Sequence, residues 1–184
     1  MEIDLSTIEF VELIKSSESP CIFRTRWRGK DCVLKVYHSM EPSYTDPVDR
    51  EVDIFKCESQ AYTKLKTHGL CDKGFVSDFY GLIKQINPKE WSSYLNEFLR
   101  DRLPPNAVLL EYIPDPQMVQ VQEHSDSVLL IDFDRAQTFS HDTIADRRRQ
   151  LLNEEKELME YVVNALAADY KDGKIQHTWY CYYG

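Results

Sequence analysis

Cys21 to His38 reads CIFRTRWRGKDCVLKVYH, two runs in which apolar and aromatic residues alternate with polar ones. Such alternation is typical of strands that bury one face, and the short Arg28-Gly29-Lys30 segment between the runs favours a tight turn. We therefore expect a β-hairpin. The apolar positions of the second run are Cys32, Leu34 and Val36. Lys35 is then expected on the other face of this strand, beside bulky neighbours.

The segment after the hairpin has the pattern of an amphipathic helix. Pro47 suits the first helical position, Gly69 suits the end, and apolar residues recur at steps of three and four. These residues are Val48, Val52, Phe55, Tyr62 and Leu65. Glu58 lies on this apolar stripe, where a carboxylate needs a partner. Lys35 is the candidate partner, and a Glu58 exposed at the edge of the stripe is the alternative.

Further strands are expected at 75–83, at Ala107–Tyr112 and at Val128–Ile131. Between the first two, Asn87 followed by Pro88 and Glu90 favours a second helix. The residues expected on its buried face are Trp91, Tyr94, Leu95, Phe98 and Leu99.

A long C-terminal helix is expected over residues 142–172, closed by Gly173. Its apolar stripe consists of Ile144, Leu151, Leu158, Met159, Val162, Val163 and Leu166. We expect this helix to pack on the core. The aromatic tail HTWYCYYG is expected to pack back on the domain, and binding of a partner is the less favoured alternative.

Together these elements predict an α+β fold with a mainly antiparallel five-stranded sheet, packed helices and a long C-terminal helix. The sheet contains the strands around Phe23, Lys35, Phe79 and Leu110, with the helix from Pro47 to Lys66 on one face. The length of 184 residues suits a single domain. Within it, residues 1–140 form the sheet portion, and residues 141–184 form the C-terminal helix and tail.

Composition restricts the partners. The net charge of −9 and the pI near 5.0 oppose a nucleic-acid surface or an anionic membrane surface, because both depend on accumulated Lys and Arg. Acidic residues near the N-terminus and the lack of a long apolar run predict a soluble, cytoplasmic protein. Five cysteines without CxxC spacing indicate neither disulfides nor a zinc site, and no cofactor is indicated.

Four short motifs resemble those of protein-kinase-like folds. They are VLKVY around Lys35, CESQAYTKL around Glu58, VLLEYIP around Glu111, and LLIDFDRA around Asp132. In that order they resemble the marker lysine, its glutamate partner, the hinge strand and the metal-binding Asp-Phe-Gly turn. The residues of these motifs are most similar to those of small fungal-type kinase-like and aminoglycoside-phosphotransferase-like proteins. The resemblance implies a Lys35–Glu58 pair, a hinge at Glu111 to Ile113, Asp132 as the metal acid and a sheet like a kinase N-lobe.

The sequence departs from these families at two places. Kinases carry a glycine-rich loop over the phosphates, whereas Lys15 to Cys21 reads KSSESPC. The interval before the Asp-Phe-Asp turn, Asp115 to Ser127, lacks the His-Arg-Asp…Asn catalytic loop. Without these groups the chain resembles a truncated kinase that lacks phosphotransfer activity.

We therefore expect a protein that binds a small organic metabolite in the former nucleotide cleft. It would act by acid–base chemistry such as dehydration, cyclisation or isomerisation, as a biosynthetic enzyme, and without a metal. The candidate catalytic residues are Asp132, Lys35 and Glu58, with Asp132 as the acid–base group or polar anchor. The candidate substrate-binding residues are Glu111, Tyr112, Asp134 and His124.

Two other interpretations remain open. The chain could be a pseudokinase-type scaffold that binds a nucleotide weakly, or a protein partner, and catalyses nothing. The lysine, glutamate and aspartate could also form a relict polar network that only holds the sheet and helix together. The sequence leaves the oligomeric state undetermined.

Overall fold

The structure, a computed structural model, describes residues 2–17, 20–47, 50–74, 76–114, 133, 136–138 and 146–174. The chain divides into two compact units, Met1–Thr138 and Phe139–Gly184. This boundary lies close to the predicted division between residues 140 and 141. That the whole chain forms a single domain stays a prediction.

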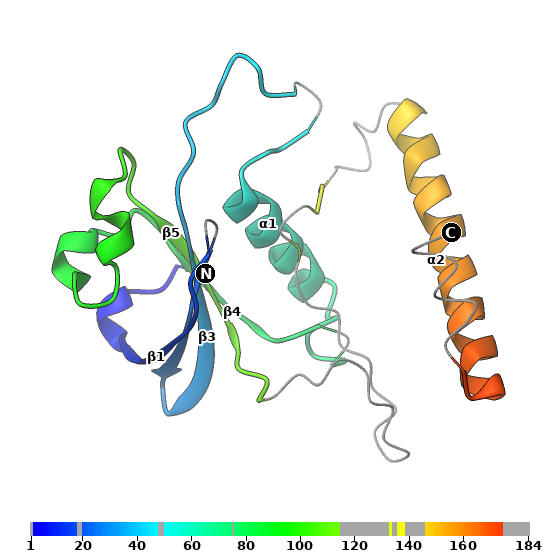
Figure 1. Ribbon diagram of the computed structural model, residues 1–184, viewed down its shortest axis with the longest axis horizontal. Helices are drawn as coiled ribbons and strands as arrows, with labels where there is room; N and C mark the ends of the chain where they lie inside the picture. The colour runs from blue at the N-terminus through cyan, green and yellow to red at the C-terminus, as the bar shows by residue number, and fades with distance from the viewer. Residues whose placement is uncertain are drawn as a thin grey trace. The chain divides into compact units, whose positions relative to one another are not determined.

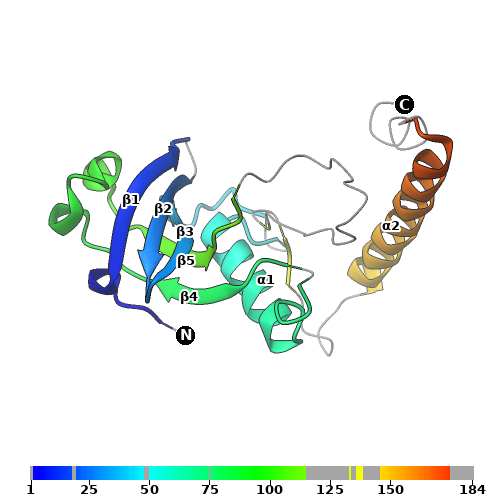
Figure 2. The same cartoon turned by 90° about the horizontal axis from the view of Figure 1, so that it is seen from below.

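The first unit contains one antiparallel sheet of five strands in the order β1-β2-β3-β5-β4 (Figures 1 and 2). The strands are β1 Ile8–Lys15, β2 Cys21–Trp27, β3 Lys30–Tyr37, β4 Phe79–Ile83 and β5 Asn106–Glu111. The predicted α+β class and the antiparallel five-stranded sheet are confirmed.

The expected hairpin is formed by β2 and β3, which pair from Cys21↔Val36 to Trp27↔Lys30. Its loop consists of Arg28 (φ 50°) and Gly29 (φ 76°), both in the left-handed region. Two such residues give a turn whose twist matches that of the strands.

Strand β1 was not predicted. It starts regularly, with Ile8 and Phe10 buried, but the pairing register with β2 shifts twice, between Phe10 and Glu12 and between Leu13 and Lys15. These shifts break the period-two pattern by which a strand is recognised. On the opposite edge of the sheet, the Ile3 amide donates to the Leu82 carbonyl oxygen of β4 at 2.7 Å.

Helix α1 spans Ile54–Thr67, so the predicted start at Pro47 is wrong. The carboxylate of Asp53 accepts from the Lys56 amide and caps the helix. Before it, Glu51 Oε1 accepts from the amides of Val52 and Asp53, which fixes these residues outside the helix. Val48, also assigned to the helix, lies outside the described residues.

The predicted helix after Asn87 is wrong as well. Asn87 does cap a helical turn, but the segment forms two 3₁₀ turns, η2 Pro88–Trp91 and η3 Asn96–Arg100. Leu95 and Phe98 alone are buried among the five expected apolar residues, and Tyr94 and Leu99 are exposed. A 3₁₀ turn repeats every three residues, so it cannot keep the stripe of an α-helix on one side.

The two faces of the sheet carry separate apolar clusters. The η face, covered by η2 and η3, is defined by Phe10, Cys21, Phe23, Cys32, Leu34, Val36, Ile83, Leu95, Phe98, Ala107 and Leu109. The α1 face, against which α1 packs, is defined by Tyr37, Phe55, Tyr62, Val76, Phe79, Val108 and Leu110. Figure 2 shows α1 beside β4 and β5. The predicted split of β3 between the faces is confirmed.

The later strands agree in part with expectation. Strand β5 matches the predicted Ala107–Tyr112 within one residue at each end. The segment at 75–83 becomes strand only from Phe79, and Val76 and Ser77 are buried ahead of it. The predicted strand Val128–Ile131 lies outside the described residues.

In the second unit, α2 spans Asp146–Asp172 and is followed by Gly173 at φ 63°. The predicted long C-terminal helix and its end are confirmed, while residues 142–145 and the aromatic tail lie outside the described residues. Four members of the predicted stripe are exposed: Leu158, Met159, Val163 and Leu166. That this helix packs on the core stays a prediction.

Candidate functional site

The centre of the candidate site is an ion pair between β3 and α1. Lys35 Nζ lies 2.7 Å from Glu58 Oε1, and the two side chains are 13% and 1% exposed. Strand alternation directs Lys35 to the α1 face, because its neighbours Leu34 and Val36 fill the η face. The predicted pairing of Lys35 with Glu58 is confirmed.

Glu58 reaches this position because α1 presents it with its apolar residues. Phe55 is three positions earlier and Tyr62 is four positions later, so all three lie on one side of the helix. The second carboxylate oxygen of Glu58, Oε2, accepts a hydrogen bond from the Tyr37 hydroxyl. Both oxygens are thus engaged, which offsets the cost of burying the charge.

Phe133, the central residue of the Asp-Phe-Asp turn, packs on the same helix. Its ring lies edge-on to the Tyr62 ring, with centroids 5.1 Å apart and an interplanar angle of 88°. Phe133 thereby joins the cluster of the α1 face. The flanking Asp132 and Asp134, and also His124, lie outside the described residues, so their assigned roles stay predictions.

Gln137 and Thr138 follow this turn and form hydrogen bonds with Glu51, which precedes α1, and with Gln60 of α1. The sequence did not identify either residue. Gln137 accepts from the Glu51 amide at 2.9 Å through Oε1 and donates to the Glu51 carbonyl oxygen at 3.0 Å through Nε2. The Thr138 hydroxyl donates to Gln60 Oε1 at 2.6 Å. Single polar residues that bond far along the chain leave no periodic pattern, so no local signal could have identified them.

Glu111 and Tyr112 lie at the end of β5, away from the ion pair. Cys32 pairs with Glu111 and Lys35 pairs with Val108, a separation of about 10 Å along the strand. The Glu111 carboxylate accepts from the Asp78 amide at 3.1 Å, on the side of the sheet opposite to Lys35. A structural role therefore accounts for Glu111, while its predicted role in binding stays a prediction.

Tyr112 lies beneath Arg24, whose guanidinium carbon is 4.8 Å from the centre of the ring. Arg24 also pairs with Asp31 at 3.0 Å and with Glu12 at 3.3 Å. These two carboxylates raise the pKa of the guanidinium above its ordinary value. Arg24 shares the α1 face of the sheet with Lys35, since Arg24 pairs with Val33 across the hairpin.

The connection between β1 and β2 is hydrogen-bonded to η3. The Ser16 hydroxyl lies 3.0 Å from both carboxylate oxygens of Glu97, and the Cys21 thiol lies 3.0 Å from one of them. Burial, with the nearby carboxylate of Glu97, raises the pKa of Cys21 to about 11. The same hydrogen bonds, first from Cys21 and then from Ser16, lower the pKa of Glu97.

Neither a metal-binding cluster nor a membrane-spanning helix is found in the described part of the chain. There, no group of three or more His, Cys, Asp or Glu side chains is placed to hold a metal. No helix in the described ranges combines the length and the apolar character needed to span a membrane. No family model matches the sequence, and no curated protein matches it closely enough to count as a relative.

Proposed function

We propose that this chain is a truncated kinase-like protein that binds a small organic metabolite and does not transfer phosphate. The observation that carries the proposal is the Lys35–Glu58 pair, 2.7 Å long and held between β3 and α1. It is the pair that the resemblance to kinases implies, made by the two residues that the motifs identify. The packing of Phe133 on Tyr62 adds support, because it brings the centre of the fourth motif to the same helix.

The absence of phosphotransfer rests on charge as well as on missing motifs. Phosphoryl transfer needs groups that neutralise the charge of the phosphates, and a glycine-rich loop supplies backbone amides for this purpose. Here the Ser16 hydroxyl and the Cys21 thiol are bonded to the carboxylate of Glu97. A carboxylate at this position repels a phosphate instead of attracting it.

The ligand class follows from the half-exposed side chains around Lys35. On the α1 face, the hairpin presents Ile22 and Val33 beside Arg24, with Tyr112 under the guanidinium. Apolar and aromatic surface with a few fixed polar groups is the usual lining of a site for a small organic molecule. These residues suit a ligand that is partly apolar and carries hydrogen-bond acceptors.

We assign different tasks to the three candidate catalytic residues. Both oxygens of Glu58 already accept hydrogen bonds and Lys35 neutralises the charge, so this pair is suited to positioning and to fixing the local charge. Proton transfer is then left to Asp132. Asp132 follows four apolar residues in the sequence, so we expect it to be partly buried, and a nearby ammonium would oppose the effect of burial on its pKa.

Native mass spectrometry of the purified full-length chain tests the binding proposal directly. A co-purified small molecule that is lost in Lys35→Met supports it, whereas a nucleotide or an empty protein contradicts it. Incubation with labelled ATP and magnesium is the second test, and stoichiometric phosphorylation of any acceptor would overturn the proposal.

Asp132→Asn separates catalysis from structure, because it keeps the shape of the side chain and removes the charge. Loss of product formation with an unchanged melting temperature supports the catalytic role. A large fall in melting temperature favours the relict polar network. No effect on either quantity rejects both roles for Asp132.

A second candidate function is a catalytically inactive scaffold. The exposed apolar residues Leu158, Met159, Val163 and Leu166 of α2 favour it, because exposed apolar surface is typical of sites that bind protein partners. Loss of a co-purifying protein on Leu158→Asp, with the small-molecule mass spectrum unchanged, would favour the scaffold over the metabolite-binding protein.

A further inference from the structure

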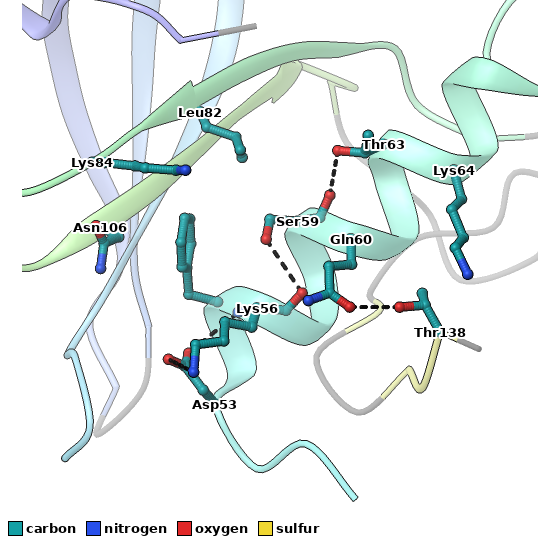
Figure 3. Close-up of a pocket in the computed structure, with 11 residues that line it drawn as sticks. Asp53, Lys56, Ser59, Gln60, Thr63, Lys64, Leu82, Lys84, Asn106 and Thr138 are labelled. Carbon is teal, nitrogen blue, oxygen red and sulfur yellow. Dashed lines mark hydrogen bonds and ion pairs between the residues drawn. The ribbon is translucent and has the colours of Figure 1, made fainter. Parts of the chain in front are cut away.

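A second depression in the first unit lies apart from the Lys35–Glu58 pair. It has a volume of about 680 Å³ and lies between α1 and the strands β4 and β5 (Figure 3). Its lining residues are Asp53, Phe55, Lys56, Ser59, Gln60, Thr63, Lys64, Leu82, Lys84, Asn106 and Thr138. The volume is within the range of sites for small molecules, and none of the described residues of the proposed metabolite site lines it.

The charge of this depression is opposite to that of the chain. Among the described lining residues there are three lysines, Lys56, Lys64 and Lys84, and one acid, Asp53, whereas the whole chain has a net charge of −9. The Asp53 carboxylate is already committed, because it caps α1 and lies 3.8 Å from Lys56 Nζ. A local excess of positive charge in an acidic protein indicates a surface that attracts anions.

Lys84 is the lysine best placed to bind such an anion. It projects from just beyond the end of β4 towards the depression (Figure 3). Within the described ranges it has no hydrogen bond and no ion pair. Its ammonium can therefore bind an anion without first breaking an existing contact. Lys56 differs, because its ammonium already lies 3.7 Å from the Glu51 carboxylate and 3.8 Å from the Asp53 carboxylate.

Gln60 supplies a neutral donor on the helical side. Its Oε1 accepts from the Thr138 hydroxyl at 2.6 Å, so the amide nitrogen, on the other branch of the side chain, is turned away from Thr138 (Figure 3). The depression thus has a cationic donor on the sheet side and an amide donor on the helical side. Leu82 and Phe55 are the apolar side chains among its described lining residues.

We propose that this depression binds a small organic anion. Its phosphate or carboxylate group would pair with the ammonium of Lys84, and its apolar part would contact Leu82 and Phe55. A phosphate and a carboxylate share the acceptor oxygens that these donors need, and a neutral analogue lacks the charge that Lys84 recognises. Neither Lys35 nor Glu58 lines the depression, so this proposal does not rest on the proposed function.

The test uses the full-length, ¹⁵N-labelled chain and three probes that share a benzene ring: phenyl phosphate, phenylacetate and benzyl alcohol. Backbone amide shifts are recorded during titrations up to millimolar concentrations. We expect saturable shifts for residues 59–64 and 82–84 with one or both anions and none with benzyl alcohol. The stronger of the two anions identifies phosphate or carboxylate as the natural group.

Lys84→Gln is the decisive variant, and Lys73→Gln is the matched control. Both remove one exposed positive charge, but Lys73 lies outside the depression. Loss of one charge-assisted hydrogen bond should weaken anion binding about tenfold in Lys84→Gln. Binding should be unchanged in Lys73→Gln.

Three results would overturn the proposal. They are equal weakening in both variants, equal binding of benzyl alcohol and the anions, and the absence of saturable shifts at the named residues. Lys84→Gln leaves Lys35 and Glu58 intact, so the mass spectrum of the co-purified metabolite separates a failure here from a failure of the proposed function.

Discussion

The η face and the α1 face take their side chains from the same strands, yet only the α1 face buries an ion pair among the described residues. On β3 the two faces alternate residue by residue, with Leu34 and Val36 on one side and Lys35 between them on the other. The η face is closed by apolar and aromatic contacts, such as Phe10 against Phe23 with centroids 5.2 Å apart. The α1 face instead encloses the carboxylate of Glu58.

The difference shows which of the two faces can be explained by its contribution to stability alone. Burial of apolar side chains stabilises the η face at little cost beyond conformational entropy. A buried ion pair must first lose its hydration, so it often adds less stability than an apolar pair of the same size. Stability alone therefore does not explain why this face carries Lys35 and Glu58, and the proposed function would give the pair a role.

The largest effect is expected on breaking the ion pair of the α1 face. Lys35→Met leaves the Glu58 charge buried without its cation, which should lower the free energy of unfolding by about 3–5 kcal/mol. Urea denaturation of the full-length chain measures this change. Lys30→Met, at the exposed start of β3, serves as the control and should have little effect.

The double variant Lys35→Met with Glu58→Leu sharpens the same comparison. It replaces the ion pair by apolar side chains, so most of the lost stability should return. A double variant as unstable as Lys35→Met alone would show that the α1 face depends on these charges for folding.

On the η face, a truncation should cost almost as much but should have no such rescue. Leu109→Ala leaves a cavity in a fully buried position, for which we expect a loss of about 3 kcal/mol. Leu13→Ala on β1 removes the same atoms from an exposed side chain and is the matched control. Equal losses for the two leucines in urea denaturation would contradict the assignment of the η face as core.

A smaller effect is expected on removal of the Tyr37 hydroxyl, which donates a hydrogen bond to Glu58. Tyr37→Phe removes the hydrogen bond to Glu58 Oε2, and a bond to a charged group contributes about 2 kcal/mol. In the Glu58→Leu background the same change should be close to neutral. A double-mutant cycle measures the coupling, and equal effects in both backgrounds would show that the hydroxyl acts elsewhere.

The smallest effect concerns pH and the thiol of the η face. The pKa of Cys21 is raised from 9.0 to about 11, so its neutral form stabilises the folded state fully below pH 9. That contribution is lost as pH rises from 9 to about 11. The free energy of unfolding of Cys21→Ala should fall less steeply over this range than that of the parent chain.

Cys57→Ala provides the comparison for that experiment, since Cys57 also has a raised pKa but lies on α1 without a carboxylate bonded to its thiol. A larger change of slope is expected for Cys21→Ala than for Cys57→Ala, because Glu97 adds to the effect of burial at Cys21. Identical slopes would indicate that Glu97 leaves the thiol unaffected.

The sequence predicted the ion pair because two independent periodicities agree on it. Strand alternation puts Lys35 opposite the apolar face, and the three- and four-residue steps of α1 put Glu58 among Phe55 and Tyr62. Neither inference depends on distant contacts. The same reasoning predicted β2, β3, β5 and the end of α2 within one or two residues.

The two wrong helix predictions have a common physical cause, which is side chains that bond to nearby backbone. Glu51 and Asp53 hold the amides before α1 and delay its start, although Pro47 had favoured an earlier one. Asn87 caps the N-terminus of a short 3₁₀ turn where a longer helix was expected. Such bonds compete with helix formation over one turn and are invisible to a periodicity that needs several turns.

The edges of the sheet have a consequence for assembly. An open strand edge presents unpaired backbone groups to other chains, and long regular edges favour fibrillar aggregation. Here the Ile3 amide donates a hydrogen bond to the Leu82 carbonyl oxygen at the β4 edge. At the β1 edge, two register shifts interrupt the pairing of β1 with β2. Glu9, Glu12 and Lys15 add charge along β1. A second chain approaching either edge therefore meets an interrupted template, so the sheet is expected to stay five-stranded even in concentrated solution.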